Sequence, residues 1–337
     1  MPTLSQDSVK VLPMRSRSAM TLEEIRDEMF RRPPTLQGLQ GGWASTNNCQ
    51  SNLGLVGVAP PQSSPVIAAA AGALPKMLKA RFYYWASPAA GMTFQPGFDA
   101  DASRRLTAID VMITQIDDEN IGILFSTRTR LYLNKRAGVI ASLNSILQTR
   151  DATIKIDRAR SHLELLDADI FLWLTVQRRD KPQVHDDVHL DDVSGISGRD
   201  ASSRTAELKA GVDFERPNFL TSVAEIDTLG PIDICFVHHV GDQNHSYEVR
   251  VHVDGGFEIR RNGVHLPAIV DSGDLMVEAS LLLAYSLIPL LNAIYIADAD
   301  NWSSRRIEVI QSAMQVLEER YSTLRMALLR QLAASAK

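Results

Sequence analysis

The most apolar stretch of the chain runs from Ala279 to Ala297 and contains no charged residue. A helix that is apolar on every side lies inside a protein core or crosses a membrane. Pro289 stands near the middle of this stretch, and Ser280, Ser286 and Asn292 would each need a polar partner within lipid. The flanking residues are acidic, with no cluster of Lys or Arg close by. We therefore expect a buried core helix and no membrane span.

A second helix is predicted directly after this stretch, with Ser303 or Ser304 as its N-cap. Its apolar residues recur in alternating steps of three and four, the spacing of a heptad seam. The residues of this seam are Ile307, Ile310, Met314, Leu317, Tyr321, Leu324 and Leu328. The short connection favours an antiparallel hairpin with the apolar helix, and the alternative is an interface with another copy. A parallel self-pair is disfavoured, because Arg320 would face the partner's Arg325.

The order of the expected elements predicts an α+β fold with mostly antiparallel sheet and helical insertions, closed by the C-terminal antiparallel helix pair. A chain of 337 residues has room for one large or two medium domains. We expect a soft boundary near Lys181, where strand-like segments begin to dominate. The expected parts are a flexible lead, short helix and Gly/Pro/Ala-rich linker over 1–78, an α+β domain over 79–181, a β-rich region over 182–271, and the helical pair packed on the core over 272–337.

Local signals predict the individual elements. A helix should begin after Thr21, because Glu24 follows at the capping-box spacing, and it should end at Arg32 before two prolines. The strand over 106–116 carries apolar residues on both faces, so it should be central in its sheet. The other expected helices cover 67–73, 130–147, 157–166 and 219–226, and the other expected strands cover 80–86, 121–126, 152–156, 170–176, 188–194, 205–214, 232–240, 247–253 and 257–260.

Charge and cysteine content limit the class of protein. The net charge of −5 gives no general attraction to nucleic acid or to anionic membranes, so any such attraction must be local. The two cysteines, Cys49 and Cys235, argue against a disulfide scaffold. The first residues lack the apolar core of a secretory signal. These features predict a cytoplasmic protein.

The strongest local charge is a basic block between Ser126 and Arg160. Eight Lys and Arg residues stand there against two acidic residues, a local net charge of +6. Hydroxyl groups, guanidinium groups and helix N-terminal amides together suit phosphate oxygens, so we expect a phosphate- or nucleic-acid-binding surface. The alternative is a solvated face whose arginines pair with acids elsewhere in the fold. The candidate residues are Ser126, Thr127, Arg128, Arg130, Lys135, Arg136, Lys155, Arg158 and Arg160.

A second candidate site lies in an acidic, histidine-bearing stretch. If residues 185–191 are extended, His185, Asp187, His189 and Asp191 share one face and could bind a divalent metal. Glu207 and Lys209 follow in an expected strand as an E-x-K triplet, a pattern that one chain of this size contains about once by chance. These few residues resemble the PD-(D/E)xK pattern. That resemblance implies a nuclease with catalytic Glu207 and Lys209 and a Mg²⁺ or Mn²⁺ ion, and the alternative is a polar surface loop.

A third group, Cys235 with His238 and His239, lacks the fourth ligand that zinc requires. The favoured function is therefore a cytosolic binding or assembly component with a phosphate- or nucleic-acid-binding basic surface. One alternative is a metal-dependent phosphodiesterase or nuclease, and another is a structural subunit of a larger complex. The expected partners are nucleic acid and a protein partner or second copy bound through the C-terminal helices, with no membrane. Whether the chain is an enzyme stays open at this level.

Overall fold

The structure is a computed structural model, and the chain divides into two compact units. Unit 1 contains Met1–Glu164, Asp254–Asn262 and Ala268–Ile288, and unit 2 contains Leu165–Val253, Gly263–Pro267 and Pro289–Lys337. The boundary expected near Lys181 thus falls inside unit 2. The structure describes residues 7–44, 60–86, 104–129, 133, 138–157, 160–165, 167–199, 205–209, 220–221, 223, 228–267 and 275–335.

The core of unit 1 is an antiparallel sheet with the strand order β2-β4-β5-β6-β1-β12, and β3 pairs with β4 beside it. The strand β5 lies between β4 and β6, which confirms the central strand expected over 106–116. The strands are β1 (Ser8–Arg17), β2 (Gly42–Trp43), β3 (Val66–Ala68), β4 (Met77–Ala86), β5 (Arg105–Asp117), β6 (Asn120–Phe125) and β12 (Phe257–His265).

The strand β1 corrects the prediction of a flexible lead over the first residues. Its first half pairs with β12 and its second half pairs with β6, so it is an interior strand. The segment has few β-branched residues and contains Pro13, which is why its composition did not indicate a central strand. Its burial comes from neighbours that are distant in the sequence.

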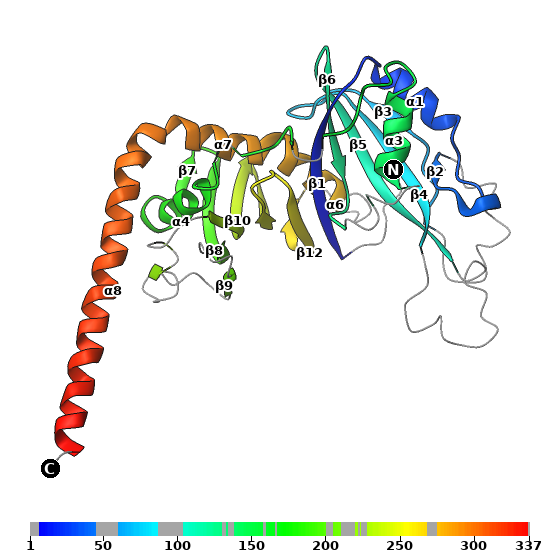
Figure 1. Cartoon of the computed structure of the whole chain (residues 1–337). Coiled ribbons are helices and arrows are strands. Elements are labelled where there is room, and N and C mark those ends of the chain that lie inside the picture. Colours follow the sequence, from blue (N-terminus) through cyan, green and yellow to red (C-terminus); the bar gives the residue numbers. More distant parts are fainter. Residues whose placement is uncertain are drawn as a thin grey trace, which may run out of the picture. The chain divides into compact units, whose positions relative to one another are not determined.

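Two helices, α1 (Leu22–Phe30) and α3 (Val139–Leu147), cover one face of this sheet (Figure 1). The predicted capping box of α1 is confirmed. The Thr21 hydroxyl accepts a hydrogen bond from the Glu24 amide at 3.2 Å, and the Glu24 carboxylate accepts one from the Thr21 amide at 2.9 Å. The helix buries Ile25 and Met29 in the same core cluster as Leu143 of α3.

Other local predictions in unit 1 are corrected. Residues 67–73 are not helical, because Val66–Ala68 forms β3 on the edge of β4 and a turn follows with Gly72 at φ +57°. Residues 152–153 form a turn and 154–156 have no regular secondary structure, so the expected strand is absent there, and the described residues of 157–166 form no helix. Asp157 instead makes an isolated bridge to Arg15. A short 3-10 turn, Gln37–Leu39, precedes β2.

Unit 2 contains antiparallel strands in the order β11-β10-β8-β7, and β9 pairs with β8. The strands expected after Lys181 are thereby confirmed as strands, with shifted ends. They are β7 (Gln183–His185), β8 (Val188–Arg199), β9 (Thr205–Lys209), β10 (Thr228–Val240) and β11 (Gln243–Val251). Residues 210–214, which were included in one expected strand, lie outside the described residues.

The strand expected over 170–176 is wrong, because Ile170–Asp180 forms the helix α4. Every residue from Ile170 to Gln177 is buried. A helix that is buried all round has no polar face, so a short apolar run of this kind does not distinguish a helix from a buried strand. Inside α4, the Thr175 hydroxyl donates to the Phe171 carbonyl oxygen at 2.7 Å.

The apolar stretch near the C-terminus is helical throughout, as α6 (Leu275–Leu282), the π-helical turn η4 (Leu283–Leu287) and α7 (Ile288–Ala297). The π turn lies just before Pro289. Proline removes one amide donor and crowds the carbonyl four residues earlier, and a wider turn accommodates this. The segment is long and apolar enough to cross a membrane by length and composition, and half of its most apolar window is buried within the protein.

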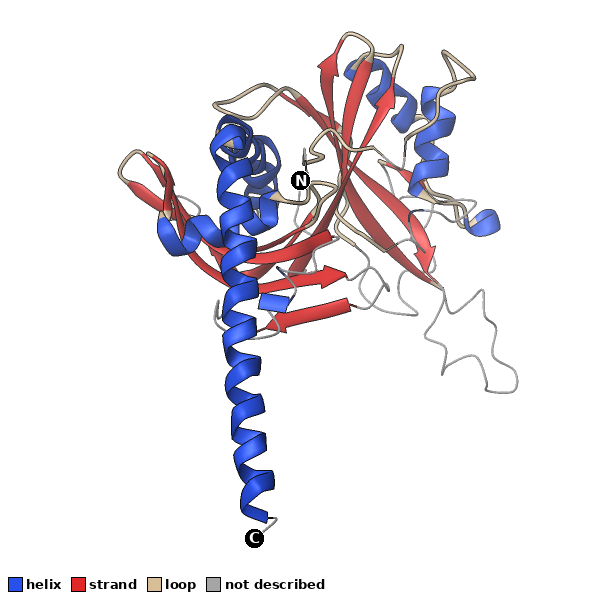
Figure 2. Cartoon of the chain, turned by 60° about the vertical axis from the view of Figure 1, so that its left-hand side comes forward, coloured by secondary structure: helices blue, strands red, loops and turns tan. Residues whose placement is uncertain are grey.

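The last helix, α8 (Ala299–Ser335), begins before the expected caps and leaves α7 at a sharp bend (Figure 1). Its first turns are held at α4, because the Trp302 indole and the Arg306 guanidinium donate to Asp169 at 2.7 and 2.9 Å. The expected C-terminal helices are present, but α8 does not form the predicted hairpin: most of its heptad seam is exposed to solvent. Figure 2 shows α8 running well beyond the strands of unit 2.

Candidate functional site

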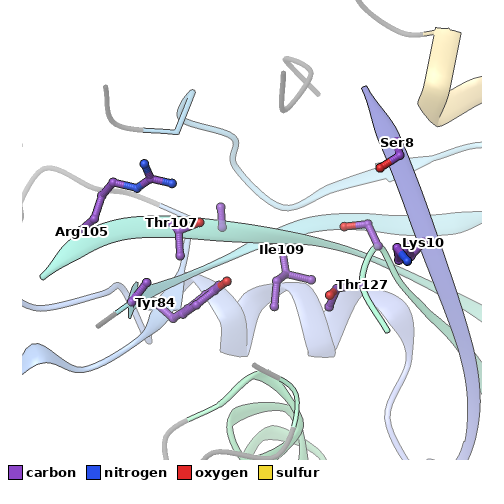
Figure 3. Close-up of a pocket in the computed structure, with 10 residues that line it drawn as sticks. Ser8, Lys10, Tyr84, Arg105, Thr107, Ile109 and Thr127 are labelled. Atoms are coloured by element: carbon purple, nitrogen blue, oxygen red, sulfur yellow. The ribbon is translucent and has the colours of Figure 1, made fainter. Parts of the chain in front are cut away.

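The candidate site is a cavity of about 310 Å³ in unit 1, at one end of its sheet (Figure 3). Among the described residues, its lining combines two cations with five hydroxyl-bearing side chains and three apolar residues. The lining residues are Ser8, Lys10, Tyr84, Ala86, Arg105, Thr107, Ala108, Ile109, Ser126 and Thr127.

The cavity arises because the core-facing side of four adjacent strands changes from apolar to polar at the same end. On β5, the alternating residues Ile113, Val111 and Ile109 belong to the core, and Thr107 and Arg105 continue the same face into the cavity. In an antiparallel sheet, the start of β5 and β1 lies beside the end of β4 and β6. The other three strands make the same change from a core residue to a cavity residue. It runs from Phe82 to Tyr84 on β4 and from Phe125 to Thr127 at the end of β6. On β1 it runs from Leu12 to Lys10 and Ser8.

The two cations lie at opposite ends of the cavity (Figure 3). The Lys10 ammonium lies 2.8 Å from a carboxylate oxygen of Glu258, and half of the Lys10 side chain is exposed. Arg105 is exposed, and no carboxylate within the described part of the chain forms an ion pair with it. An exposed pair such as Lys10–Glu258 is worth about 0–1 kcal/mol, so an anionic ligand can compete with Glu258 for the ammonium.

Among the described residues of the basic block predicted from the sequence, Ser126 and Thr127 line this cavity. The Ser126 hydroxyl accepts a hydrogen bond from the Asp110 amide at 2.9 Å. The Thr127 hydroxyl accepts one from the Thr129 amide at 3.1 Å. Each hydroxyl therefore keeps its own proton for donation to a ligand.

Arg128 does not line the cavity. Its guanidinium donates to both carboxylate oxygens of Asp254, at 3.0 and 2.8 Å, and also to the Val11 carbonyl oxygen at 3.4 Å. A Cβ atom on Gly256 would lie 1.9 Å from the Arg128 guanidinium, so this close approach requires glycine. The alternative interpretation, in which an arginine of the block pairs with a distant acid, is thus correct for Arg128.

The remaining residues of the basic block do not extend the site within the described structure. Lys155 and Arg160 are exposed. The Lys155 carbonyl oxygen accepts a bond from the Ser16 hydroxyl at 3.5 Å, near the end of β1 that is remote from Ser8. The predicted phosphate-binding residues Arg130, Lys135, Arg136 and Arg158 lie outside the described residues.

The extended face predicted for the acidic, histidine-bearing stretch does not form. His185 ends β7 and Val188 begins β8, with a turn between them, so the four predicted metal ligands do not share one strand face. The His185 imidazole lies 3.8 Å from the Asp187 carboxylate, and the His189 imidazole bonds the Gln183 side chain at 3.1 Å. Asp191 is exposed on β8. No group of three His, Cys, Asp or Glu side chains among the described residues could hold a metal ion.

Glu207 and Lys209 lie on β9, as expected for a strand, opposite Ser197 and Gly195 of β8. Their side chains lie outside the described residues, so their predicted catalytic roles stay predictions. On β10, the thiol of Cys235 has a pKa raised to about 11, chiefly by burial, which keeps it protonated and unreactive at neutral pH.

Two histidines of unit 2 form a cross-strand pair. His238 of β10 lies directly opposite His245 of β11, with ring centroids 6.3 Å apart. Burial lowers the pKa of both imidazoles, and neighbouring histidines lower it further. Both rings are therefore favoured in the neutral form, in which they face each other without charge repulsion.

The cavity residues Ser8, Lys10, Tyr84, Arg105 and Thr107 were missed by sequence reasoning. Each is a polar residue near the end of its strand, and this is the signal that could have indicated them. No protein-family model matches the chain, and no curated protein matches it. The geometry of the site is therefore the basis for assigning a function.

Proposed function

We propose that this protein binds a phosphate-bearing ligand, a nucleotide or a nucleic-acid strand, in the cavity of unit 1. The observation that carries the proposal is the change from apolar to cationic and hydroxyl side chains at the same end of four neighbouring strands. Ammonium, guanidinium and hydroxyl groups all donate hydrogen bonds, and they are the groups that bind phosphate oxygens.

The size and the lining of the cavity favour binding over catalysis. A volume of about 310 Å³ is at the lower end of the range for small-molecule sites, so it suits one nucleotide or one phosphate group with its sugar. None of the described residues that line it carries a carboxylate or an imidazole, the usual general bases. The proposal therefore assigns recognition of phosphate to this cavity and no hydrolysis.

In this proposal the protein works in the cytosol, and the helix from Leu275 to Ala297 is a core element. Leu281, Leu283 and Leu287 are fully buried in the fold, which supports this assignment. Recovery of the full chain in the membrane fraction after alkaline extraction would contradict it.

The test is a binding titration of the full chain with fluorescently labelled single-stranded DNA, double-stranded DNA and RNA at two salt concentrations. Competition with a nucleotide and with inorganic phosphate separates strand binding from recognition of a single phosphate group. We expect binding that weakens with salt, and a loss of about tenfold in affinity in the double variant Lys10→Ala/Arg105→Ala, with a shallower salt slope.

Lys155→Ala is the matched control, because Lys155 is an exposed cation of the same unit near the far end of β1. It should leave the affinity unchanged. If Lys155→Ala weakens binding as much as the double variant, the attraction is general surface charge and the cavity assignment is wrong. No binding of any probe at low salt would overturn the proposal altogether.

A further inference from the structure

The second half of α8 presents a long apolar seam to solvent. Ala313 is the last buried residue of the helix within its described part. The exposed fraction of the side chain is 55% for Ile307, which precedes Ala313. After Ala313 it is 55% for Met314, 60% for Tyr321, 57% for Leu324 and 55% for Leu328. A large exposed apolar patch of this kind marks an interaction surface.

The spacing of this seam defines the geometry of its partner. Apolar residues at heptad positions a and d pack against another helix with the same repeat. An isolated helix of this length in water draws its stability mainly from the packing of its apolar face. The partner is therefore expected to be a helix that runs along the seam.

We propose that α8 pairs with α8 of a second copy in an antiparallel arrangement that places Glu318 beside the partner's Arg325. With Met314 and Tyr321 at position a and Leu317 and Leu324 at position d, Glu318 and Arg325 occupy position e, and Arg320 occupies position g. The exposed charges at these flanking positions decide between the possible pairings.

A parallel pair places residues at g beside residues at e of the partner. Arg320 would then lie beside the partner's Arg325 in both halves of the dimer, and Glu318 would lie beside the partner's Ala313. Two like-charge contacts and no opposite-charge contact disfavour this arrangement.

An antiparallel pair places e beside e and g beside g of the partner. A pair centred at Glu319 would set Glu318 against the partner's Glu318 and Arg320 against the partner's Arg320. Moving the centre to lie between Ser322 and Thr323 replaces these contacts with two Glu318–Arg325 pairs and sets each Arg320 beside an alanine.

This register also gives good apolar layers. Leu317 packs against the partner's Leu328, and Tyr321 packs against the partner's Leu324, each twice by symmetry. The paired segment extends from Met314 to Gln331, which lies within the exposed part of α8. Charge complementarity and exposure thus select the same pairing.

Sedimentation of the full chain over a range of concentrations tests the proposal, with circular dichroism as the check on helix content. We expect a dimer. Arg325→Glu and Glu318→Arg should each weaken it by about tenfold, because two opposite-charge pairs become like-charge pairs. The double variant Glu318→Arg/Arg325→Glu should restore the wild-type affinity.

The same substitution distinguishes the two directions of pairing. In a parallel pair, Arg325→Glu would set Glu beside the partner's Arg320 and tighten the dimer. Arg330→Glu is the control, because Arg330 lies at position c, away from the seam, and should have no effect. A monomer at all concentrations, a tighter Arg325→Glu dimer, or no recovery in the double variant would each overturn the proposal.

Discussion

Arg128 and Asp254, which are 126 residues apart in the sequence, form a two-point ion pair in unit 1. The two guanidinium–carboxylate bonds measure 3.0 and 2.8 Å, and the Asp254 carboxylate also accepts a bond from the Gly256 amide at 2.8 Å. The pair joins the segment after β6 to the turn before β12. The most prominent arginine of the basic block is therefore a structural residue.

Arg128→Ala should destabilise the protein by about 1–2 kcal/mol, because a partly buried, bidentate pair is worth more than an exposed one and Asp254 loses both guanidinium bonds. It should leave phosphate binding at the wild-type level, since Arg128 does not line the cavity. Urea unfolding and the binding titration, run on the same preparation, measure the two effects. Lost binding with unchanged stability would show that Arg128 contacts the ligand.

Thr21→Ala should destabilise unit 1 by about 1 kcal/mol, because it removes the side-chain half of the α1 capping box. Ser303→Ala is the informative comparison. Ser303 was predicted as a cap but lies inside α8, so its substitution should change stability by less than about 0.5 kcal/mol. Thermal unfolding measures both variants, and equal effects would mean that α8 begins at Ser303.

Stability should fall as the pH drops from about 6.5 toward 4, because the folded protein resists protonation of His162. Burial lowers the pKa of His162 to about 4 from its usual 6.5, while its Nδ1 donates to the Met14 carbonyl oxygen at 3.2 Å. The unfolded chain binds the proton first, so acid favours unfolding over this window. The shift corresponds to roughly 3 kcal/mol when fully expressed.

The pH dependence is measured by urea unfolding at pH 7, 5.5 and 4.5, in the wild type and in His162→Gln. The variant should be less stable at pH 7 and should lose part of the dependence between pH 6.5 and 4. His189→Gln is the control, because its side chain lies on the surface of unit 2 and bonds only Gln183 among the described groups. An unchanged slope in His162→Gln would show that other groups cause the acid sensitivity.

Elements with a local cause could be predicted from the sequence. The Thr21–Glu24 pair sets the start of α1 with its own side chains, and β5 has apolar residues on both faces, as an interior strand requires. By contrast, β1 is a strand only because β6 and β12 supply partners for its backbone. Its own residues do not carry that information.

The residues of the candidate site also divide into those that local sequence indicates and those that only distant contacts bring together. The chain's basic block could be recognised from charge alone, and two of its hydroxyl residues do line the cavity. Lys10 and Arg105 come from strands far apart in the sequence, and the antiparallel register brings their ends together. A site assembled from the ends of four strands has no local spacing that a sequence motif could display.

The sequence by itself determined the α+β class, the capped first helix, the helical C-terminal region and the heptad spacing of α8, because each depends on periodicity or on contacts between near neighbours. The tertiary structure decided that Ile170–Asp180 is a helix, that Arg128 is bound by Asp254, and that the seam of α8 stays exposed. These outcomes depend on which distant surface meets a segment, and a residue's neighbours along the chain do not specify that surface.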